Sequence, residues 1–298
     1  MAFKTVALLM PGEMGAAVGK AFSQSGLDVV TCLDGRSAAT AERAAAAGFR
    51  DLPDLEALLG EAEIVLSIMP PEHAPATARK VAGAMESSGL TPPYADMNAV
   101  APQTARHMQA LIEGAGAPYI DGGIVGNPPG KSNPTRFFVS GAEAGLMDGL
   151  DGRGIEVRQC GPEIGRGVAV KMCYAAITKG TSALHTAVLI AAQSLGVADE
   201  LHQELAISQP QFYARMEAVV PKLPAVSARY IGEMKEIAKT MESAGLTANF
   251  HVAAGELYRV LEKTPFAAER RDTVDPDRTL RQSLEVFARH LPKVPAAQ

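Results

Sequence analysis

The chain has 298 residues, of which 47% are hydrophobic and 20% are charged. This length and composition allow a sizeable buried core and favour a soluble enzyme of two domains. A net charge of −5 without any basic run argues against an extended nucleic-acid-binding surface. No apolar stretch reaches the roughly 18 residues of a membrane span, and the first strand begins too early for a signal peptide. We therefore expect a cytoplasmic protein that binds neither nucleic acid nor membrane.

Neither the cysteines nor the histidines show the spacing of a metal site. Cys32, Cys160 and Cys173 lie far apart within apolar stretches, which is typical of buried, reduced thiols. No two of the six histidines are four residues apart. We therefore expect no metal site in this protein.

The first motif along the chain is an apolar strand that runs into a glycine turn and a helix of small residues, over residues 6–19. Gly12 and Gly15 match the second and third glycines of the G-x-G-x-x-G pattern, while Met10 replaces the first. In that arrangement the N–H groups of a helix N-terminus meet a pyrophosphate. An ordinary strand-to-helix turn is the alternative. Because strand, turn and helix follow in the right order, we expect cofactor contacts from Pro11, Gly12, Glu13, Met14 and Gly15.

Through the first half of the chain, short apolar runs alternate with helical patterns such as 38–47 and 101–113. Strands are expected at residues 5–10, 28–33, 63–69, 94–97, 119–121 and 136–140. This alternation predicts a mostly parallel, doubly wound α/β sheet, which is a Rossmann domain over residues 1–163. The turn-rich loop 128–134 is suited to the edge of a site.

From residue 164 the pattern becomes helical, with no convincing strand. A long helix is expected over residues 164–195, followed by helices at 201–220, 225–244, 250–263 and 278–291. The sequence therefore predicts an all-helical domain over residues 164–298, joined to the Rossmann domain by the long helix.

The long helix begins with the pattern G-x-G-x-x-x-K, formed by Gly165, Gly167 and Lys171. At 100° per residue, Thr178 shares the helix face of Lys171 and Tyr174 lies at its margin. Ala175, Ser182 and His185 lie on the same face, and small residues occupy the opposite side. A solvated helix lysine is the common alternative. In a cleft beside a nucleotide domain, however, Lys171 would be an apt proton donor and acceptor.

Together these segments resemble the β-hydroxyacid dehydrogenases, the superfamily of 3-hydroxyisobutyrate and 6-phosphogluconate dehydrogenases. The resemblance is carried by the glycine turn with Met14, the segments 96–102 and 119–123, and the motif that ends at Lys171. It runs in collinear order from residue 6 to about residue 245. It implies hydride transfer between NAD(P) and a hydroxyl-bearing carbon, with Lys171 as the general acid and base. It also implies a C-terminal helical domain that forms homodimers or homotetramers.

The same resemblance implies further site residues. Segment 67–71 is similar to the family loop along the nicotinamide ribose, which implies cofactor contacts from Ile68, Met69, Pro70 and Asn98. The expected substrate-binding residues, taken from the matching segments and from the lysine face of the helix, are Asn98, Asp121, Gly122, Gly123, Tyr174, Thr178 and Glu233.

Three positions depart from the family pattern. Tyr174 and Ala175 replace asparagines, residues 124–127 replace a serine-glycine-glycine loop, and Gly232 and Glu233 replace a lysine-aspartate pair. These family positions help to hold a small carboxylate, so we expect a bulkier or less acidic substrate. Tyr174 either donates a hydroxyl to that substrate or is a core tyrosine. Segment 171–180 resembles a subgroup whose C-terminal domain has no assigned function.

Cofactor choice depends on the end of the second expected strand, where Asp34, Gly35, Arg36 and Ser37 follow one another. An acidic side chain there accepts hydrogen bonds from the ribose of NAD, whereas an arginine beside a hydroxyl binds the 2′-phosphate of NADP. Counted back from Gly48, Arg36 and Ser37 fall at the family's phosphate-binding positions. We therefore expect NADP, with NAD as the alternative because of Asp34.

Three classes of function remain open. The first is a dehydrogenase acting on a small hydroxy or carbonyl substrate. An imine reductase of the same architecture is the second, and a non-catalytic nucleotide-binding module is the third. Lys171 counts against both alternatives, because the related imine reductases generally replace this lysine and a binding module would not need it.

Overall fold

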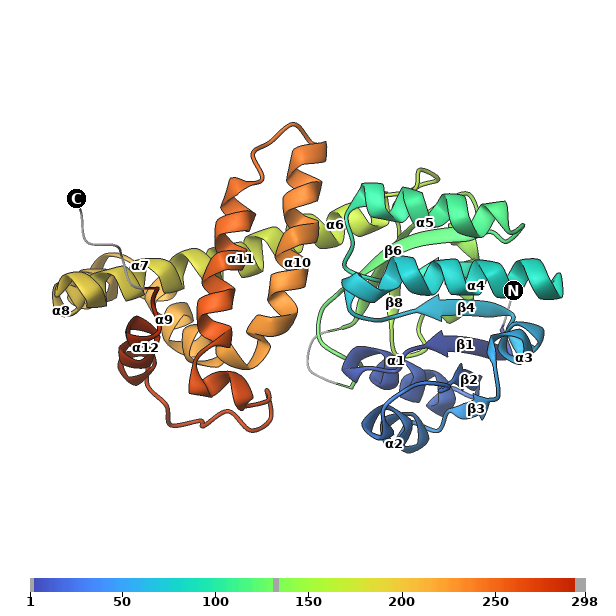
Figure 1. The fold of residues 1–298 in the computed structure, drawn as a ribbon, viewed down its shortest axis with the longest axis horizontal. Helices are drawn as coiled ribbons and strands as arrows, with labels where there is room; N and C mark the ends of the chain where they lie inside the picture. The colour runs from blue at the N-terminus through green and yellow to red at the C-terminus, as the bar shows by residue number, and fades with distance from the viewer. Residues whose placement is uncertain (1–2, 131–133, 293–298) are drawn as a thin grey trace. The chain divides into compact units, whose positions relative to one another are not determined.

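A computed structural model describes residues 3–130 and 134–292 of the chain (Figure 1). The chain divides into two compact units, Met1–Tyr174 and Ala175–Gln298. The sequence predicts this boundary between residues 163 and 164, whereas the structure assigns most of helix α6 (Arg166–Ala175) to the first unit. Hydrogen bonds between the beginning of α6 and the neighbouring strands account for the difference.

The first unit contains one eight-stranded sheet with the strand order β3-β2-β1-β4-β5-β6-β7-β8. Neighbouring strands run parallel, except for the antiparallel pair β6 and β7. Between β1 and β4 the strand order changes direction, which makes this the switch point of a doubly wound sheet. The strands are β1 (Thr5–Leu9), β2 (Asp28–Cys32), β3 (Arg50–Leu52), β4 (Ile64–Ser67), β5 (Tyr94–Asp96), β6 (Tyr119–Val125), β7 (Arg136–Ser140) and β8 (Glu156–Gln159).

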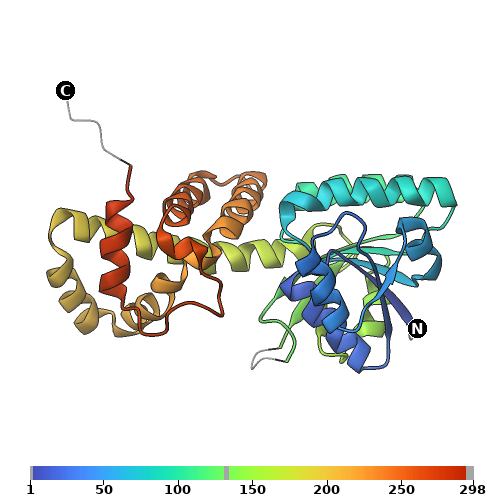
Figure 2. The same cartoon turned by 60° about the horizontal axis from the view of Figure 1, so that its bottom comes forward.

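Helices cover both faces of this sheet. In Figure 2, α4 and α5 lie along one face and α1 lies on the other. The helices of this unit before α6 are α1 (Glu13–Gln24), α2 (Ala38–Ala46), α3 (Leu55–Glu61), α4 (Ala74–Ser88) and α5 (Pro102–Gly114), with short 3-10 segments η1 (Pro71–His73) and η2 (Ala144–Leu150). The predicted Rossmann architecture is confirmed.

The central strands form the core of the first unit. Every residue of β4 and β6 is buried, and parallel strands covered on both faces read as continuous apolar runs. This is why all six expected strands are present. The sequence did not predict β3 and β8, which are the two edge strands of the sheet. Both are short and rich in charged residues, so neither has an apolar run that would mark a strand.

Among its described residues the second unit contains helices and no strand. Its elements are the π-helical segment η3 (Ala176–Gly180), α7 (Thr181–Leu195), α8 (Ala198–Ser208), α9 (Pro210–Val219), η4 (Val220–Lys222), α10 (Pro224–Ser243), α11 (Asn249–Glu262), η5 (Pro265–Ala268) and α12 (Leu280–Arg289). The helix expected over 201–220 is broken at Gln209, because the residue before a proline avoids helical geometry. No helix in the described part of the chain combines the length and apolarity needed to cross a membrane.

The segment η3 changes the helix face that the sequence predicts. One π-helical turn holds an extra residue, so it rotates the following side chains by roughly a quarter turn. The regular helical spacing that predicts Ser182 on the face of Lys171 is therefore interrupted by η3, and Ser182 is buried. Their shared face stays a prediction. The expectation of three buried cysteines is wrong, since Cys173 on α6 is exposed while Cys32 and Cys160 are half-buried.

Candidate functional site

The turn after β1 has the backbone that a glycine would favour, although Met10 stands there. Among the described residues other than glycine, only Met10 has a positive φ, at 53°. Such a conformation costs on the order of 1–3 kcal/mol for a residue with a side chain. The carbonyl of Met10 accepts a hydrogen bond from Gly12 at 2.7 Å, and α1 begins at Glu13 directly after Gly12. The predicted residues Pro11 to Gly15 thus form the strand-to-helix turn at the switch point.

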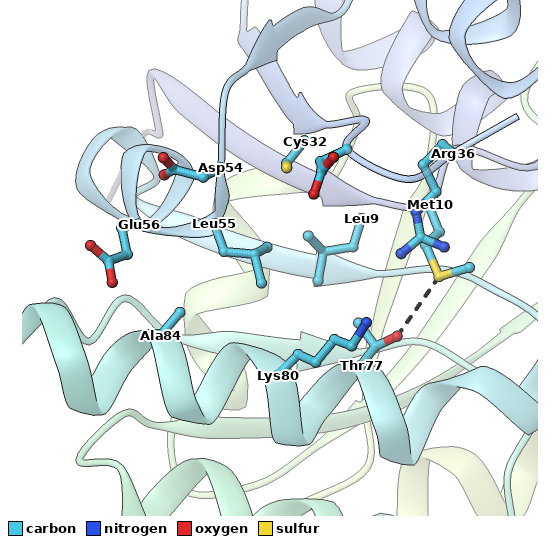
Figure 3. A pocket seen from close by; sticks show the side chains of 11 residues that line it. Leu9, Met10, Cys32, Arg36, Asp54, Leu55, Glu56, Thr77, Lys80 and Ala84 are labelled. Atoms are coloured by element: carbon cyan, nitrogen blue, oxygen red, sulfur yellow. Dashed lines mark hydrogen bonds between the residues drawn. The ribbon is translucent and has the colours of Figure 1, made fainter. Parts of the chain in front are cut away.

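A cavity of about 570 Å³ adjoins this turn (Figure 3). Its walls come from the ends of β1 and β2, the beginning of α3 and one face of α4. The lining residues are Leu9, Met10, Cys32, Asp34, Arg36, Asp54, Leu55, Glu56, Thr77, Lys80 and Ala84. Ligands of doubly wound sheets bind beyond the carboxyl ends of the strands at such a switch point.

The chemistry of this cavity fits the adenosine half of a dinucleotide. Leu9, Met10 and Leu55 provide apolar surface for a base, and Asp34 and Arg36 provide groups that bind a ribose or a phosphate. Both of these polar residues were predicted from the sequence.

Ser37, also predicted to contact the cofactor, lies at the beginning of α2. Its hydroxyl accepts a hydrogen bond from the N–H of Thr40 at 3.3 Å and caps the helix. Its contact with the cofactor stays a prediction.

Asn98 connects the loop after β4 to the end of β5. Its side-chain oxygen accepts a hydrogen bond from the N–H of Met69 at 2.6 Å. Its amide nitrogen donates to Ser67 Oγ at 2.8 Å and to Asp96 Oδ1 at 2.6 Å. Asn98 therefore fixes the loop that contains the predicted residues Ile68, Met69 and Pro70.

Asp96 is a buried carboxyl that our prediction did not select, although it begins the segment 96–102. It is the last residue of β5 and pairs in register with Asp121 on β6. The pKa of Asp96 is raised to about 7, because burial and, to a lesser degree, the nearby charge of Asp121 raise it more than the hydrogen bonds from Asn98 lower it. Two carboxyl groups thus lie close together at the carboxyl ends of β5 and β6.

Asp121 holds the beginning of helix α6. Its Oδ2 atom accepts hydrogen bonds from the N–H groups of Gly165 and Val168, each at 3.1 Å, and from Ser140 Oγ at 2.8 Å. Ser140 Oγ in turn accepts the N–H of Gly167 at 2.9 Å. Burial raises the pKa of Asp121, while these hydrogen bonds lower it. Oδ2 is thus occupied by the beginning of α6 and by Ser140, whereas Oδ1 is buried without a hydrogen-bond partner among the described residues. The predicted contact of Asp121 with substrate stays a prediction.

The glycines of the lysine motif and of β6 allow α6 to lie against the sheet. Gly165 has a φ of +103°, which favours glycine. A Cβ on Gly167 would lie 2.7 Å from the carbonyl oxygen of Phe138. A Cβ on Gly123 would collide with Lys171 Cβ and lie 3.1 Å from Lys171 Cγ. The structure therefore brings two of the predicted residues together, because Lys171 packs directly over Gly123.

Gly122, which was also predicted to bind substrate, is closely packed within β6, and its contact with substrate stays a prediction. A Cβ there would lie 2.6 Å from the side chain of Met97 and 2.9 Å from the carbonyl oxygen of Phe138. Of the loop 128–134 that we expect at the edge of a site, residues 131–133 lie outside the described residues.

The remaining predicted substrate residues lie at the end of α6 and in the second unit. Tyr174, near the end of α6, is 50% exposed. Thr178 lies in η3 and donates a hydrogen bond to the carbonyl of Ala175 at 3.4 Å. Glu233, on α10, is buried and forms an ion pair with Lys179. The substrate roles of all three stay predictions.

Lys179 was missed by the sequence prediction. Its ammonium group lies 4.6 Å from the ring centroid of Tyr230, and its carbonyl accepts a hydrogen bond from the hydroxyl of Tyr258 at 2.8 Å. A lysine in an otherwise apolar helix was the available signal, but its partners come from distant helices. Among the described residues no group of three or more histidine, cysteine or acidic side chains is arranged to hold a metal ion.

Two family descriptions match the chain. Residues 5–148 match the NAD binding domain of 6-phosphogluconate dehydrogenase, and residues 192–261 match DUF1932, a domain of unknown function. The chain is therefore similar to the NAD binding domain of 6-phosphogluconate dehydrogenase in its first part and to DUF1932 in its second. This confirms the resemblance to the β-hydroxyacid dehydrogenase superfamily and to a subgroup with an unassigned C-terminal domain.

Solved structures share the fold over nearly the full length. A conserved hypothetical protein from Sinorhizobium meliloti 1021 is 23% identical with a TM-score of 0.69, covering 98% of this chain and 97% of its own. Mycobacterium tuberculosis 3-hydroxyisobutyrate dehydrogenase is 20% identical with a TM-score of 0.68, covering 96% of this chain and 98% of its own.

A sequence relative covers a shorter part of the chain. An uncharacterized 28.5 kDa protein of Methanothermus fervidus is 27% identical over 190 residues, which are 64% of this chain and 71% of that protein.

Proposed function

We propose that the protein is an NADP-dependent oxidoreductase that transfers a hydride between the nicotinamide and a hydroxyl-bearing carbon of a small organic substrate. The observation that carries this proposal is the position of Lys171 against Gly123. Gly123 lies two residues beyond Asp121, which pairs with the last residue of β5. Lys171 thus lies at the end of the sheet where ligands of this fold bind.

Lys171 is the proposed general acid and base. When bound, NADP supplies the hydride acceptor or, in its reduced form, the hydride donor. The amine of Lys171 takes the proton of the substrate hydroxyl during oxidation and returns it to the carbonyl oxygen during reduction. Asp121 acts through α6, because its hydrogen bonds fix the beginning of the helix that carries the lysine.

The preference for NADP rests on Arg36, which lines the cavity beside the glycine turn. A guanidinium group can form two parallel hydrogen bonds to the 2′-phosphate of NADP, whereas NAD has only a hydroxyl at the 2′ position. Two proteins of this fold hold the same class of cofactor. These are Psf3 with NADP+, 18% identical with a TM-score of 0.61, and Aspergillus terreus reductive aminase with NADPH, 18% identical with a TM-score of 0.55.

An imine reductase is the second candidate, and the exposed phenol of Tyr174 favours it. Tyr174 lies three residues after Lys171 on α6 and is half exposed. A Streptomyces aurantiacus imine reductase shares the fold with a TM-score of 0.52 and 19% identity. In both candidates we propose a substrate that is bulkier or less acidic than a small hydroxyacid, because Gly232 replaces the family's lysine and Lys179 is already paired with Glu233.

The test compares Lys171→Ala, Lys171→Arg and Tyr174→Phe in a screen of alcohols, carbonyl compounds and imines, read by the absorbance of reduced nicotinamide. Lys171→Ala should lower turnover by about 10²- to 10⁴-fold, while NADP affinity stays within about twofold. Lys171→Arg should not restore turnover, because a guanidinium does not release a proton near neutral pH. Lys20→Ala removes an exposed lysine of α1 and serves as the control. Normal turnover in Lys171→Ala together with loss in Tyr174→Phe would favour the imine reductase.

We further propose a cytoplasmic homodimer or homotetramer formed through the helices of the second unit. An apolar groove of about 570 Å³ lies between α7 and α11. Along it Leu184 is 63% exposed and Phe250 is 77% exposed. Exposed apolar patches of this kind are typical of surfaces that bind another protein chain.

A further inference from the structure

The face of α4 that lines the nucleotide cavity carries a lysine that the prediction of cofactor residues did not include. Thr77, Lys80 and Ala84 follow the helical spacing of one face, and all three line the cavity. Arg36 enters the same cavity from the turn after β2. The cavity is therefore lined by two cations that come from two different structural elements.

The charges in the cavity are separated in space. Figure 3 shows the ammonium group of Lys80 and the guanidinium group of Arg36 directed toward the same end, beside Thr77 and Met10. Asp54 and Glu56 lie toward the other end. Both are engaged there, since Asp54 accepts the N–H of Ala57 at 2.8 Å and Glu56 accepts the hydroxyl of Ser87 at 2.7 Å. Lys80 and Arg36 therefore share one end of the cavity, away from Asp54 and Glu56.

Within the described residues, neither Arg36 nor Lys80 forms an ion pair through its side chain. Thr77 donates its hydroxyl to Met10 Sδ at 3.7 Å, and a thioether sulfur is a weak acceptor. A dianion at this place would gain two charged donors and one hydroxyl donor without displacing a strong internal bond. The Arg36 fork suits two phosphate oxygens, and the compact Lys80 ammonium adds a point charge.

We propose that Lys80 is a specificity-determining residue that binds the 2′-phosphate of NADP together with Arg36, from the opposite wall of the cavity. This inference rests on the proposed function, because it assigns the phosphate to the same cofactor. With NAD, the two cations would face a neutral hydroxyl and repel each other, so the pair disfavours NAD as well as favouring NADP. Asp34, which also lines the cavity, remains available to the ribose hydroxyl that both cofactors share.

The experiment measures the binding of 2′,5′-ADP and 5′-AMP by isothermal titration calorimetry, so neither a substrate nor turnover is needed. Lys80→Ala should weaken binding of 2′,5′-ADP by about tenfold and change binding of 5′-AMP by less than about twofold. Lys80→Arg keeps the positive charge and should retain most of the affinity. Arg79→Ala is the matched control, because it removes one exposed positive charge from the neighbouring position of α4, outside the cavity lining.

The outcomes separate this inference from the proposal on which it rests. If wild-type protein binds 5′-AMP as tightly as 2′,5′-ADP, the NADP preference itself is wrong and the inference fails with it. If wild type prefers 2′,5′-ADP and Arg36→Ala abolishes the preference while Lys80→Ala behaves like Arg79→Ala, only the role of Lys80 is refuted. Equal weakening of both nucleotides by Lys80→Ala would also refute it, because Lys80 would then act on a group that the two share.

Discussion

Replacing Asp96 with asparagine should remove a pH dependence that this carboxyl imposes on the stability of the first unit. Burial raises the pKa of Asp96 from 3.8 to about 7 in the folded protein. Between these two values the folded state holds a proton that the unfolded state has released. The free energy of unfolding therefore falls as the pH rises, with the contribution fully present below about pH 4 and lost above about pH 7.

The size of this effect follows from the separation of the two pKa values. Each unit of pH within the window costs about 1.4 kcal/mol, so raising the pH from about 5 to about 8 should lower the free energy of unfolding of the wild type by roughly 2–3 kcal/mol. Asparagine has nearly the same shape and retains a side-chain oxygen that can accept the amide of Asn98. Asp96→Asn should therefore lose much less stability over the same range, and at about pH 8 it should gain relative to the wild type.

The assay is urea unfolding followed by far-UV circular dichroism at each pH, with hydrogen exchange of the β4 to β6 amides. Hydrogen exchange is needed because it reports on the first unit alone, whereas a protein of two units does not have to unfold in one step. Glu86→Gln removes an exposed carboxylate from α4 and controls for a change in net charge. Parallel pH profiles for Asp96→Asn and wild type would refute the reasoning, because Asp96 would then be ionised throughout the range.

Three other predictions concern packing and assembly. Gly123→Ala should destabilise the first unit by about 1–3 kcal/mol in urea unfolding, because its Cβ would collide with Lys171. Gly83→Ala, in open space on α4, should stabilise it by about 0.5–1 kcal/mol. Equal effects of the two variants would contradict the packing of Lys171 on β6. The free energy of unfolding of Met10→Val, measured with urea, should be about 1–2 kcal/mol lower than that of Met10→Gly, because a β-branched residue strongly disfavours a positive φ. The reverse order would contradict the turn geometry. Light scattering at micromolar concentration should give a mass above the 31.2 kDa of one chain. Leu184→Asp, in the apolar groove, should lower this mass, whereas Ile207→Asp, at an exposed position of α8, should not. A monomeric wild type would rule out the assembly.

Strands and helices in the interior were predictable because the local pattern of apolar residues indicates their burial. The buried strands β1 and β4 are continuous apolar runs, and α5 begins with a proline that suits a first helical turn. The edge strand β8 could not be found in this way, since Glu156–Gln159 gains its strand geometry from pairing with β7 rather than from apolar side chains. Edge strands are therefore the elements that periodicity alone misses.

The sequence predicted which residues belong to the candidate site better than it predicted what each of them does there. Lys171 and Asp121 were both selected, yet the hydrogen bond from Gly165 to Asp121 joins residues 44 positions apart, beyond the reach of any local pattern. The rotation introduced by η3 also has no periodic signal, and it changes which residues share a face beyond Gly180. Lys80 was missed because a lysine in an amphipathic helix is ordinarily solvated, and only the cavity shows that it faces Arg36.

The structure also separates the part of the lysine motif that specifies a fold from the part that specifies chemistry. Gly165, Gly167 and Gly123 are required by backbone conformation and by the close approach of α6 to the sheet. A methionine at position 171 would keep the contact with Gly123, because that contact involves only Cβ and Cγ. A protein that had lost the reaction would therefore keep the glycines and the aspartate for stability. The close contact with Gly123 does not involve the amine of Lys171, so the alanine variant tests the function and the glycine variants test the fold.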